Sequence, residues 1–159
     1  MTPVELQRYL HAHIPLSKAM QVSVLEVQPD HVTLSAPLPP NINHRETVFG
    51  GSAAAVAVLA AWSLVHTRLV AAALPSRIVI QRNTMQFAMP IAGTFTARSF
   101  LQDERPWERF TRTLKRKGKA RITVSCILDF AGQEAGHFEG EFVALDAQGR
   151  KAQPKRPVM

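Results

Sequence analysis

From residue 41 the chain reads Asn41-Ile42-Asn43-His44-Arg45-Glu46-Thr47-Val48-Phe49-Gly50-Gly51-Ser52, and an apolar run without any Asp or Glu follows from Ala53 to Leu74. The run is apolar on nearly every side, which is typical of a helix that is buried all round. Glycines at its start let another group approach the backbone closely, and the free N–H groups of a first helical turn attract a carbonyl oxygen or an anion. The pattern therefore predicts a buried central helix whose N-terminus is the floor of a binding site.

Length and composition indicate one folded domain. The chain has 159 residues and 46% hydrophobic residues, which suits one sizeable core and excludes a disordered protein. We expect a single domain over 1–147 and a polar, disordered tail over 148–159. The only cysteine, Cys126, excludes an internal disulfide framework and a multi-cysteine metal site. No secretory leader is evident, so we expect a cytoplasmic protein. The unbroken apolar part of the central run ends near Val65, short of the roughly 20 residues of a spanning helix, so no membrane span is predicted.

The net charge of +7 is concentrated in one segment, because Arg109 to Arg121 carries seven cationic side chains and no acidic one. Such a segment is either a solvated surface or a docking face for a polyanion: nucleic acid, an acidic carrier protein or a phosphorylated cofactor. Phe110 is its only aromatic residue, so base stacking has little support and a nucleic-acid module is disfavoured.

The remaining segments alternate between helix and strand patterns. A capping box from Thr2 to Glu5 predicts a short N-terminal helix that Pro15 stops, and the cationic segment reads as a second surface helix that Asp103 caps and Gly118 ends. Two-residue alternation predicts strands over residues 20–24, 32–36, 78–89, 95–101, 120–130 and 137–145. One face of the strand over 78–89 is predicted to hold Val79, Gln81, Asn83, Met85, Phe87 and Met89.

These elements predict an α+β fold in which a six-stranded antiparallel sheet wraps around the central helix, because only a curved sheet covers a helix that has no polar face. A single sheet leaves two edges and one flank of the helix uncovered. Pairing with a second copy covers both, so a homodimer is expected.

The motif Asn41-x-Asn43-x-x-x-Thr47-x-Phe49-Gly50-Gly51-Ser52, followed by Ala61-Trp62, resembles the thioesterase family of the YiiD C-terminal-domain type. The segments 87–93 and 114–122 also resemble that family. The resemblance implies the hotdog fold, a double-hotdog homodimer (or a tetramer), and a substrate that is an acyl thioester, most often acyl-CoA and sometimes acyl carrier protein. It implies no cofactor apart from the CoA of the substrate. Better-studied relatives open the helix with His-Gly-Gly and carry a catalytic carboxylate on it, whereas this chain has Phe49 and no acidic residue from 50 to 74.

Thioester hydrolysis requires a donor for the oxyanion and a positioned water. We assign the donor to the backbone N–H of Gly51, aided by Ser52. Asn43 is the first choice for orienting water, and Asn41, which is also a candidate substrate contact, is the second. The alternatives are that the glycines serve only close packing and that the asparagines are turn residues.

Two acid–base groups, His44 and Glu46, are close in sequence to the helix start. His66 is about 22 Å from Gly51 along the helix axis, so it is expected to be a buried, hydrogen-bonded residue and not a catalytic one. Cys126 is expected to be inert packing, and no His, Cys or Asp spacing suggests a metal.

The predicted substrate contacts fall into two sets. One surrounds the acyl group and comprises Phe49, Gly50, Asn83, Met85 and Phe87. The other, Lys119 and Arg121, is proposed to hold CoA phosphates or an acidic carrier protein. The leading hypothesis is an acyl-CoA or acyl-carrier thioesterase. The alternatives are a non-catalytic acyl-thioester-binding protein and, more weakly, a basic nucleic-acid-binding module.

Overall fold

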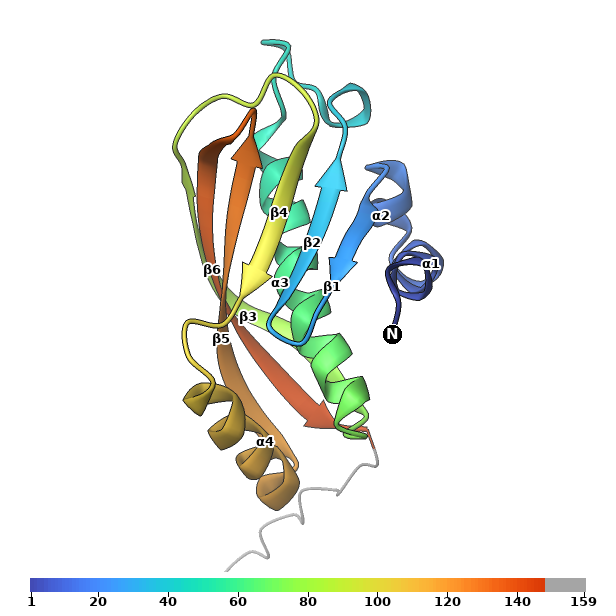
Figure 1. The fold of residues 1–159 in the computed structure, drawn as a ribbon, viewed down its shortest axis with the longest axis vertical. Helices are drawn as coiled ribbons and strands as arrows, with labels where there is room; N and C mark the ends of the chain where they lie inside the picture. Colours follow the sequence, from blue (N-terminus) through green and yellow to red (C-terminus); the bar gives the residue numbers. More distant parts are fainter. Residues whose placement is uncertain (148–159) are drawn as a thin grey trace, which may run out of the picture.

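The computed structural model describes residues 1–147 as one curved antiparallel sheet of six strands around a long helix (Figure 1). The strand order along the sheet is β1-β2-β4-β5-β6-β3. In chain order the elements are α1 (Pro3–His13), α2 (Pro15–Ala19), β1 (Ser23–Val27), β2 (His31–Ala36), a 3-10 turn (Pro39–Asn41), α3 (Gly50–Ala71), β3 (Ser76–Phe87), β4 (Phe95–Phe100), α4 (Arg105–Lys117), β5 (Lys119–Phe130) and β6 (Gln133–Asp146). The tail over 148–159, predicted to be disordered, lies outside the described residues.

The predicted order of helices and strands is confirmed, with two additions, α2 and the 3-10 turn over Pro39–Asn41. The capping box is present, since the Thr2 hydroxyl accepts the N–H of Glu5 and the Glu5 carboxylate accepts the N–H of Thr2. Pro15 ends α1 as predicted, but it also occupies the first turn of a new helix, α2. Proline has this dual effect because it lacks an N–H and has a φ that suits a first helical turn.

Helix α3 is buried because its side chains offer no polar face to water. Ala57, Ala60 and Ala61 are fully buried, and their small size lets the backbone lie close to the sheet. Ser99 on β4 fixes this approach, since its hydroxyl donates a hydrogen bond of 2.7 Å to the backbone oxygen of Ala60. By length and composition α3 resembles a membrane-spanning helix, yet most of it is buried inside the fold. The core therefore accounts for its composition.

One flank of α3 is only partly covered. This flank is formed by three half-buried residues, Ala54, Ala55 and Val58. Trp62 covers the next part of this flank toward the C-terminus of α3. Its indole N–H donates a hydrogen bond to the backbone oxygen of Ile78 on β3, and its ring stacks on Tyr9 of α1 with 6.2 Å between the ring centroids. The flank therefore opens between the edge strand β3 and the side of the molecule that carries α1.

A β-bulge in β3 corrects the predicted face of that strand. Ile80 is opposite Phe142 and Arg82 is opposite Glu141, so Gln81 is an extra residue that has no partner on β6. Opposed residues point to the same face of a sheet, and the extra residue reverses the alternation. The prediction that Val79 and Gln81 share a face with the later residues is therefore wrong. The α3 side of β3 instead holds Ile78, Ile80, Asn83, Met85 and Phe87, judged by their partners on β6.

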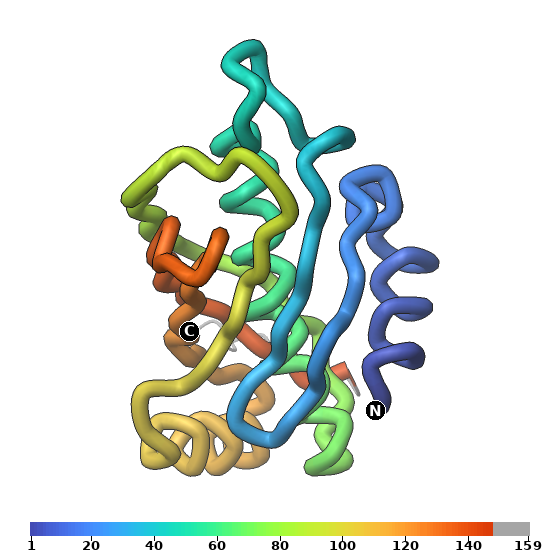
Figure 2. Tube along the Cα trace, turned by 45° about the horizontal axis from the view of Figure 1, so that its top comes forward, coloured from blue at the N-terminus to red at the C-terminus, as the bar shows by residue number. Residues whose placement is uncertain are grey.

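Helix α4 packs beside the C-terminal end of α3, at the opposite end of the molecule from the start of α3 (Figures 1 and 2). Arg68 of α3 makes two 2.8 Å hydrogen bonds to the carboxylate of Glu104 and lies 4.3 Å from the ring of Trp107. The N-cap of α4 is Glu104, without a side-chain cap bond, so the predicted cap at Asp103 is one residue early, although the Asp103 carboxylate still accepts the N–H of Arg105 at 2.9 Å. Gly118, as predicted, ends the helix with a left-handed conformation at φ 71°.

We predict that Gly118→Ala lowers the free energy of unfolding by about 1–2 kcal/mol, because a side chain disfavours the left-handed conformation. A Cβ at this position would meet only Asp146, at an ordinary contact distance of 3.7 Å, so the cost is conformational. Gly118→Asn is the matched control, since asparagine tolerates this conformation and should lose less. Urea unfolding measures all three proteins, and equal stability of the Ala variant and the parent would contradict the prediction.

Candidate functional site

The start of α3 is open to solvent and has free backbone donors. Gly51 is exposed and Gly50 is half-buried, and the helix has no side-chain cap. The N–H of Ala53 donates to the backbone oxygen of Phe49 at 3.0 Å, which is the first bond of the helix. Among residues 1–147, no partner outside α3 accepts the N–H of Gly51 or Ser52. The positive end of the α3 dipole therefore faces an accessible space.

An apolar cleft of about 360 Å³ adjoins this helix start and is lined by Thr47, Val48, Ala53, Phe87, Ala88, Met89, Pro90 and Ile91. Two exposed phenylalanines crowd the glycine pair. A Cβ on Gly51 would collide with the ring of Phe49, and one on Gly50 would be 3.5 Å from the ring of Phe87. The glycines thus leave room for aromatic rings beside the start of α3.

Asn43 organises the loop that leads into α3. Its side-chain oxygen accepts the N–H groups of Arg45 at 2.8 Å and Thr47 at 3.2 Å. Its amide nitrogen donates to the Thr47 hydroxyl at 3.0 Å and makes only a long contact, 3.5 Å, with the backbone oxygen of Val48. The side chain therefore holds the loop closed while one amide hydrogen has a weak partner.

The environment of Asn41 indicates a structural role. It is only 2% exposed, and its amide nitrogen donates to the backbone oxygens of Met20 at 2.9 Å and Pro37 at 2.8 Å. Its own backbone oxygen accepts the N–H of Phe49 at 2.7 Å. Asn41 thus joins the loop to the N-terminal part of the fold, and both of its amide hydrogens are in use.

The two predicted acid–base groups are exposed on the same loop. His44 and Glu46 are both at the surface, and Glu46 has a positive φ of 63°, which is uncommon for a residue other than glycine. The loop therefore brings a carboxylate and an imidazole to the end of the molecule where α3 starts. Asn83, Met85 and Phe87 face the α3 side of the sheet, as described above, and Phe87 reaches the glycine pair.

The predicted phosphate contacts lie elsewhere in the chain. Lys119 and Arg121 are exposed at the start of β5, next to α4, and Arg121 makes a 3.4 Å ion pair with Glu141. The α4 end of the molecule is anchored to Arg68, about 26 Å from Gly51 at 1.5 Å per residue. Within one chain the structure does not bring these cations to the start of α3.

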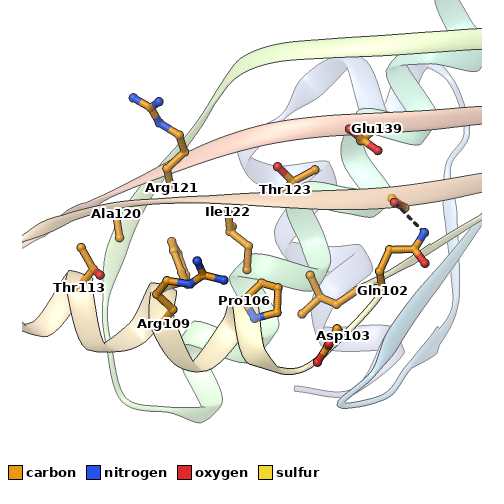
Figure 3. Close-up of a pocket in the computed structure, with 13 residues that line it drawn as sticks. Gln102, Asp103, Pro106, Arg109, Thr113, Ala120, Arg121, Ile122, Thr123 and Glu139 are labelled. Atoms are coloured by element: carbon orange, nitrogen blue, oxygen red, sulfur yellow. Dashed lines mark hydrogen bonds between the residues drawn. The ribbon is translucent and has the colours of Figure 1, made fainter.

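A second cavity, about 620 Å³ in volume, was not indicated by the sequence. We call it the β5-edge groove, and it is lined by Leu101, Gln102, Asp103, Pro106, Arg109, Phe110, Thr113, Ala120, Arg121, Ile122, Thr123, Ser125 and Glu139 (Figure 3). It lies between α4 and the first half of β5. Sequence patterns indicate the cationic helix but not its separation from the strand, which depends on tertiary packing.

A stack of aromatic rings beside α1 was also missed. His66 lies between Trp62 and Tyr9, with ring centroids 4.7 Å from each, and Tyr9 also contacts His13 at 4.3 Å. The four-residue spacing of Tyr9 and His13, and of Trp62 and His66, was the sequence signal that could have indicated this stack. Burial, together with the nearby His13, lowers the pKa of His66. The expected hydrogen bond is absent, because the buried Nε2 of His66 has no partner among the described residues.

Cys126 agrees with its predicted role as packing. It is fully buried, and burial raises the pKa of its thiol, so the reactive thiolate is disfavoured. Within residues 1–147, no group of three His, Cys, Asp or Glu side chains is arranged to hold a metal ion.

Comparison with known proteins supports this architecture. The family model described as "Putative thioesterase (yiiD_Cterm)" matches residues 4–146. A protein of unknown function from Chlorobaculum tepidum has a similar structure, with a TM-score of 0.86, 28% identity, and coverage of 91% of this chain and 97% of that one. A protein described as a "putative thioesterase" from Shewanella oneidensis has a TM-score of 0.81, 25% identity, and coverage of 90% and 96%.

A third structure, from Pseudomonas aeruginosa and described as a "Probable Thioesterase", has a TM-score of 0.77 and covers 91% of this chain and 96% of that one. At 21% identity it bears on the fold alone. Together these structures confirm the hotdog fold for this chain.

We predict that Asn41→Ala lowers the free energy of unfolding by about 1–3 kcal/mol, because two buried carbonyl oxygens lose their donor. Asn41→Asp keeps the shape but directs a carboxylate at the same carbonyls, and we expect it to be at least as unstable. Urea unfolding followed by circular dichroism measures both variants. Unchanged stability combined with a raised KM for substrate would instead assign Asn41 to substrate binding.

Proposed function

The chain belongs to the family described as "Putative thioesterase (yiiD_Cterm)", and from this membership we propose that it hydrolyses an acyl-CoA thioester at the N-terminus of α3. The observation that carries the proposal is the exposed Gly51, whose N–H has no partner outside the helix among residues 1–147, at a helix start whose Ala53 lines an apolar cleft. A thioester carbonyl that enters the cleft meets donors fixed before the reaction begins.

Polarisation of the carbonyl is the first step of the proposed mechanism. The N–H groups of Gly51 and Ser52 point out of the first turn of α3, where the helix dipole adds to their partial charge. As water attacks, the carbonyl oxygen gains negative charge, and preorganised donors stabilise it more than they stabilise the ground state.

Orientation of the attacking water is assigned to Asn43. One of its amide hydrogens makes only the 3.5 Å contact with the backbone oxygen of Val48, so it can turn to a water without breaking the loop. His44 and Glu46 on the same loop are the proposed proton acceptors. No side chain of α3 takes this role, since α3 has no Asp or Glu.

The acyl group is proposed to enter the apolar cleft. Phe87 and Met89 come from the end of β3 and the turn that follows it, and Val48 and Ile91 form the wall toward the loop. The N–H of Val48 donates to the backbone oxygen of Ile91 at 2.8 Å, which ties the two walls together. These side chains suit an aliphatic or aromatic acyl group.

A homodimer is proposed on the basis of the edge strand β3. Val79 is 51% exposed, Ile80 37% and Phe87 57%, which is unusual for apolar residues on an unpaired edge. A second copy that pairs along β3 would cover them together with the open flank of α3. Such pairing is isologous, so both copies use the same surface.

The alternative of a non-catalytic binding protein has one observation in its favour, the absence of a carboxylate on α3. A thiol-release assay over acyl-CoAs of graded chain length separates the two. Binding without release of CoA from any substrate would favour the binding protein. The nucleic-acid alternative has less support, because the aromatic residues of α4, Trp107 and Phe110, are half-buried and buried and offer no exposed stacking surface.

We predict that Gly51→Pro lowers kcat by about 10²–10³-fold, as expected when one oxyanion donor is removed. Gly51→Ala is the matched control, because it keeps the N–H and introduces the same collision with the flexible ring of Phe49. The Ala variant should therefore lose much less activity than the Pro variant. Thiol release measures both, and equal losses would show that space, not the donor, matters at this position.

We predict that Val79→Lys shifts the protein from dimer to monomer, since an edge lysine opposes pairing between strands. Light scattering coupled to size-exclusion chromatography measures the mass. Leu25→Lys is the control, because Leu25 is 50% exposed on the other edge strand, β1. A wild-type protein that is monomeric, or a Leu25 variant that dissociates equally, would contradict pairing along β3.

A further inference from the structure

We propose that the β5-edge groove binds an acidic, extended segment of another protein, which joins the sheet as an additional antiparallel strand beside β5. The inference goes beyond the proposed thioesterase activity and does not depend on it, because the groove lies at the α4 end of the molecule, far from the start of α3 (Figure 1). Unpaired backbone groups along β5, the alternation of its side chains, and cations without ion pairs carry the proposal.

The groove exists because β5 extends beyond its neighbour β4. The last pair between these strands is Phe100 with Ser125, so residues 119–124 of β5 are paired only with β6. α4 lies next to this edge without pairing with it, and a cavity of about 620 Å³ lies between them (Figure 3). This segment of β5 therefore has a free edge.

The hydrogen bonds between β5 and β6 show which backbone groups point to the free edge. The N–H of Asp146 donates to the backbone oxygen of Gly118 at 2.8 Å, so this opposed pair is a hydrogen-bonded one. Hydrogen-bonded and non-hydrogen-bonded pairs alternate along an antiparallel ladder. The N–H and C=O groups of Lys119, Arg121 and Thr123 therefore point away from β6. Within the described part of the chain no backbone group bonds to them from that side, which makes them a template for one further strand.

The side chains along the free edge alternate between two faces. Ala120 and Ile122 point toward α4, whereas Arg121 and Thr123 point to the opposite face (Figure 3). Ile122 is buried and lines the groove together with Phe110 of α4. Opposed residues of adjacent strands share a face, so a strand that pairs here places one set of side chains over Ile122 and the other beside Arg121. The first set is expected to be apolar.

Cations without ion pairs select acidic residues for the second set. Arg109 lines the groove, and Arg112 and Arg116 follow it on one side of α4 at helical spacing. These arginines are exposed, and none forms an ion pair within residues 1–147. Lys119 is exposed on the same face of β5 as Arg121. Such a group of like charges favours an acidic partner and speeds its association.

The carboxylates near the groove do not cancel this charge. Asp103 is paired with Arg105 at 2.9 Å, and Glu141 on β6 is paired with Arg121 at 3.4 Å. Glu139 also lines the groove, but it is opposed to the last residue of β5 that pairs with β4. Acidic side chains of a partner are therefore favoured toward the other end of the free edge, where β5 begins.

The position of α4 makes a second copy of this chain a poor occupant. Pairing between two β5 edges would bring two cationic α4 helices together, and their like charges oppose this contact. A single extended segment of a different protein needs only the space between α4 and the strand. In such a complex the main-chain hydrogen bonds give affinity, and the alternating side chains give specificity.

The first test uses two methylated peptides as matched controls. The probe is an end-blocked, fluorescein-labelled peptide of alternating Glu and Val, about as long as the free edge, and anisotropy should show saturable binding. In the antiparallel arrangement the Glu residues oppose Arg121 and bond to β5, so N-methylation of the Glu residues should weaken binding at least about tenfold. N-methylation of the Val residues, whose N–H groups face away, should not. No binding of the probe, or equal binding of both methylated peptides, would overturn the proposal.

The second test removes a donor from the protein. Because the N–H of Thr123 points to the free edge, Thr123→Pro removes no bond to β6, and it should weaken peptide binding about tenfold. Thr123→Val keeps the N–H and loses the same hydroxyl, so it should bind as the parent does. Thermal unfolding checks that both variants are folded. A folded Thr123→Pro protein with unchanged affinity would contradict strand addition, and the methylated peptides decide the question if that variant does not fold.

The third test separates the groove from general electrostatics. Arg109→Gln should weaken binding of the Glu-Val peptide about two- to fivefold, as expected for one exposed ion pair. Arg8→Gln, an equal charge change on the exposed face of α1, should have no effect, and a Lys-Val peptide should not bind. Equal losses in the two variants would show that net charge alone attracts the peptide, and the proposed site would be wrong.

Amide hydrogen exchange gives a readout at the edge itself. In the free protein the amides of Arg121 and Thr123 should exchange faster than those of Ala120 and Ile122, which bond to β6. Bound peptide should slow the exchange of Arg121 and Thr123 at least about tenfold. Binding that leaves these amides unchanged, or a single-stranded RNA that displaces the peptide and binds more tightly, would overturn the proposal. No measurement here depends on thiol release, so failure of the thioesterase function is recognised separately.

Discussion

The burial of a helix with no polar face is the constraint on which the rest of this structure depends. α3 has no acidic residue, and its alanine-rich surface lies close enough to β4 for the Ser99 hydroxyl to reach the backbone of Ala60 at 2.7 Å. Water cannot satisfy such a surface, so the sheet must curve around it. A sheet of six strands covers most of the circumference and leaves the flank at Ala54, Ala55 and Val58 half-buried. The same hydrophobic requirement that shapes the protomer thus supports association with a second copy.

The two ends of α3 differ chemically, and this difference organises the candidate function. At its N-terminus the glycine pair leaves backbone donors open to the cleft. At its C-terminus Arg68 holds Glu104 and Trp107, which fixes α4 and its arginines at the far end of the molecule. The backbone N–H groups at the start of α3 carry partial positive charge, and the arginines of α4 carry full positive charge. This separation matches a substrate that has a neutral reacting carbonyl and a highly charged tail.

Patterns that depend on local physics were predictable from the sequence, whereas features that depend on packing were not. The capping box at Thr2, the left-handed Gly118 and the alternation in β5 each follow from a few neighbouring residues. The bulge at Gln81 was not visible, because Ile78, Ile80, Met85 and Phe87 all favour a strand and only their partners on β6 show that the register shifts. At the site, the glycine pair was identified by its position before an apolar run. The commitment of Asn41 to the backbone oxygen of Met20 joins chain segments far apart in sequence, so composition did not reveal it.

The missing carboxylate on α3 is consistent with the same constraint. A carboxylate in the first turns of α3 would be stabilised by the helix dipole, but its negative charge would also cancel part of the field that the free N–H groups direct at a substrate carbonyl. The first turns of α3 carry only glycine, serine and alanine side chains, so no carboxylate there opposes that field, which in the proposed mechanism acts on the developing oxyanion. The proposed mechanism leaves proton transfer to the exposed loop that carries His44 and Glu46. This division of tasks, as proposed, predicts a rate that responds more to the backbone at Gly51 than to any single acidic side chain.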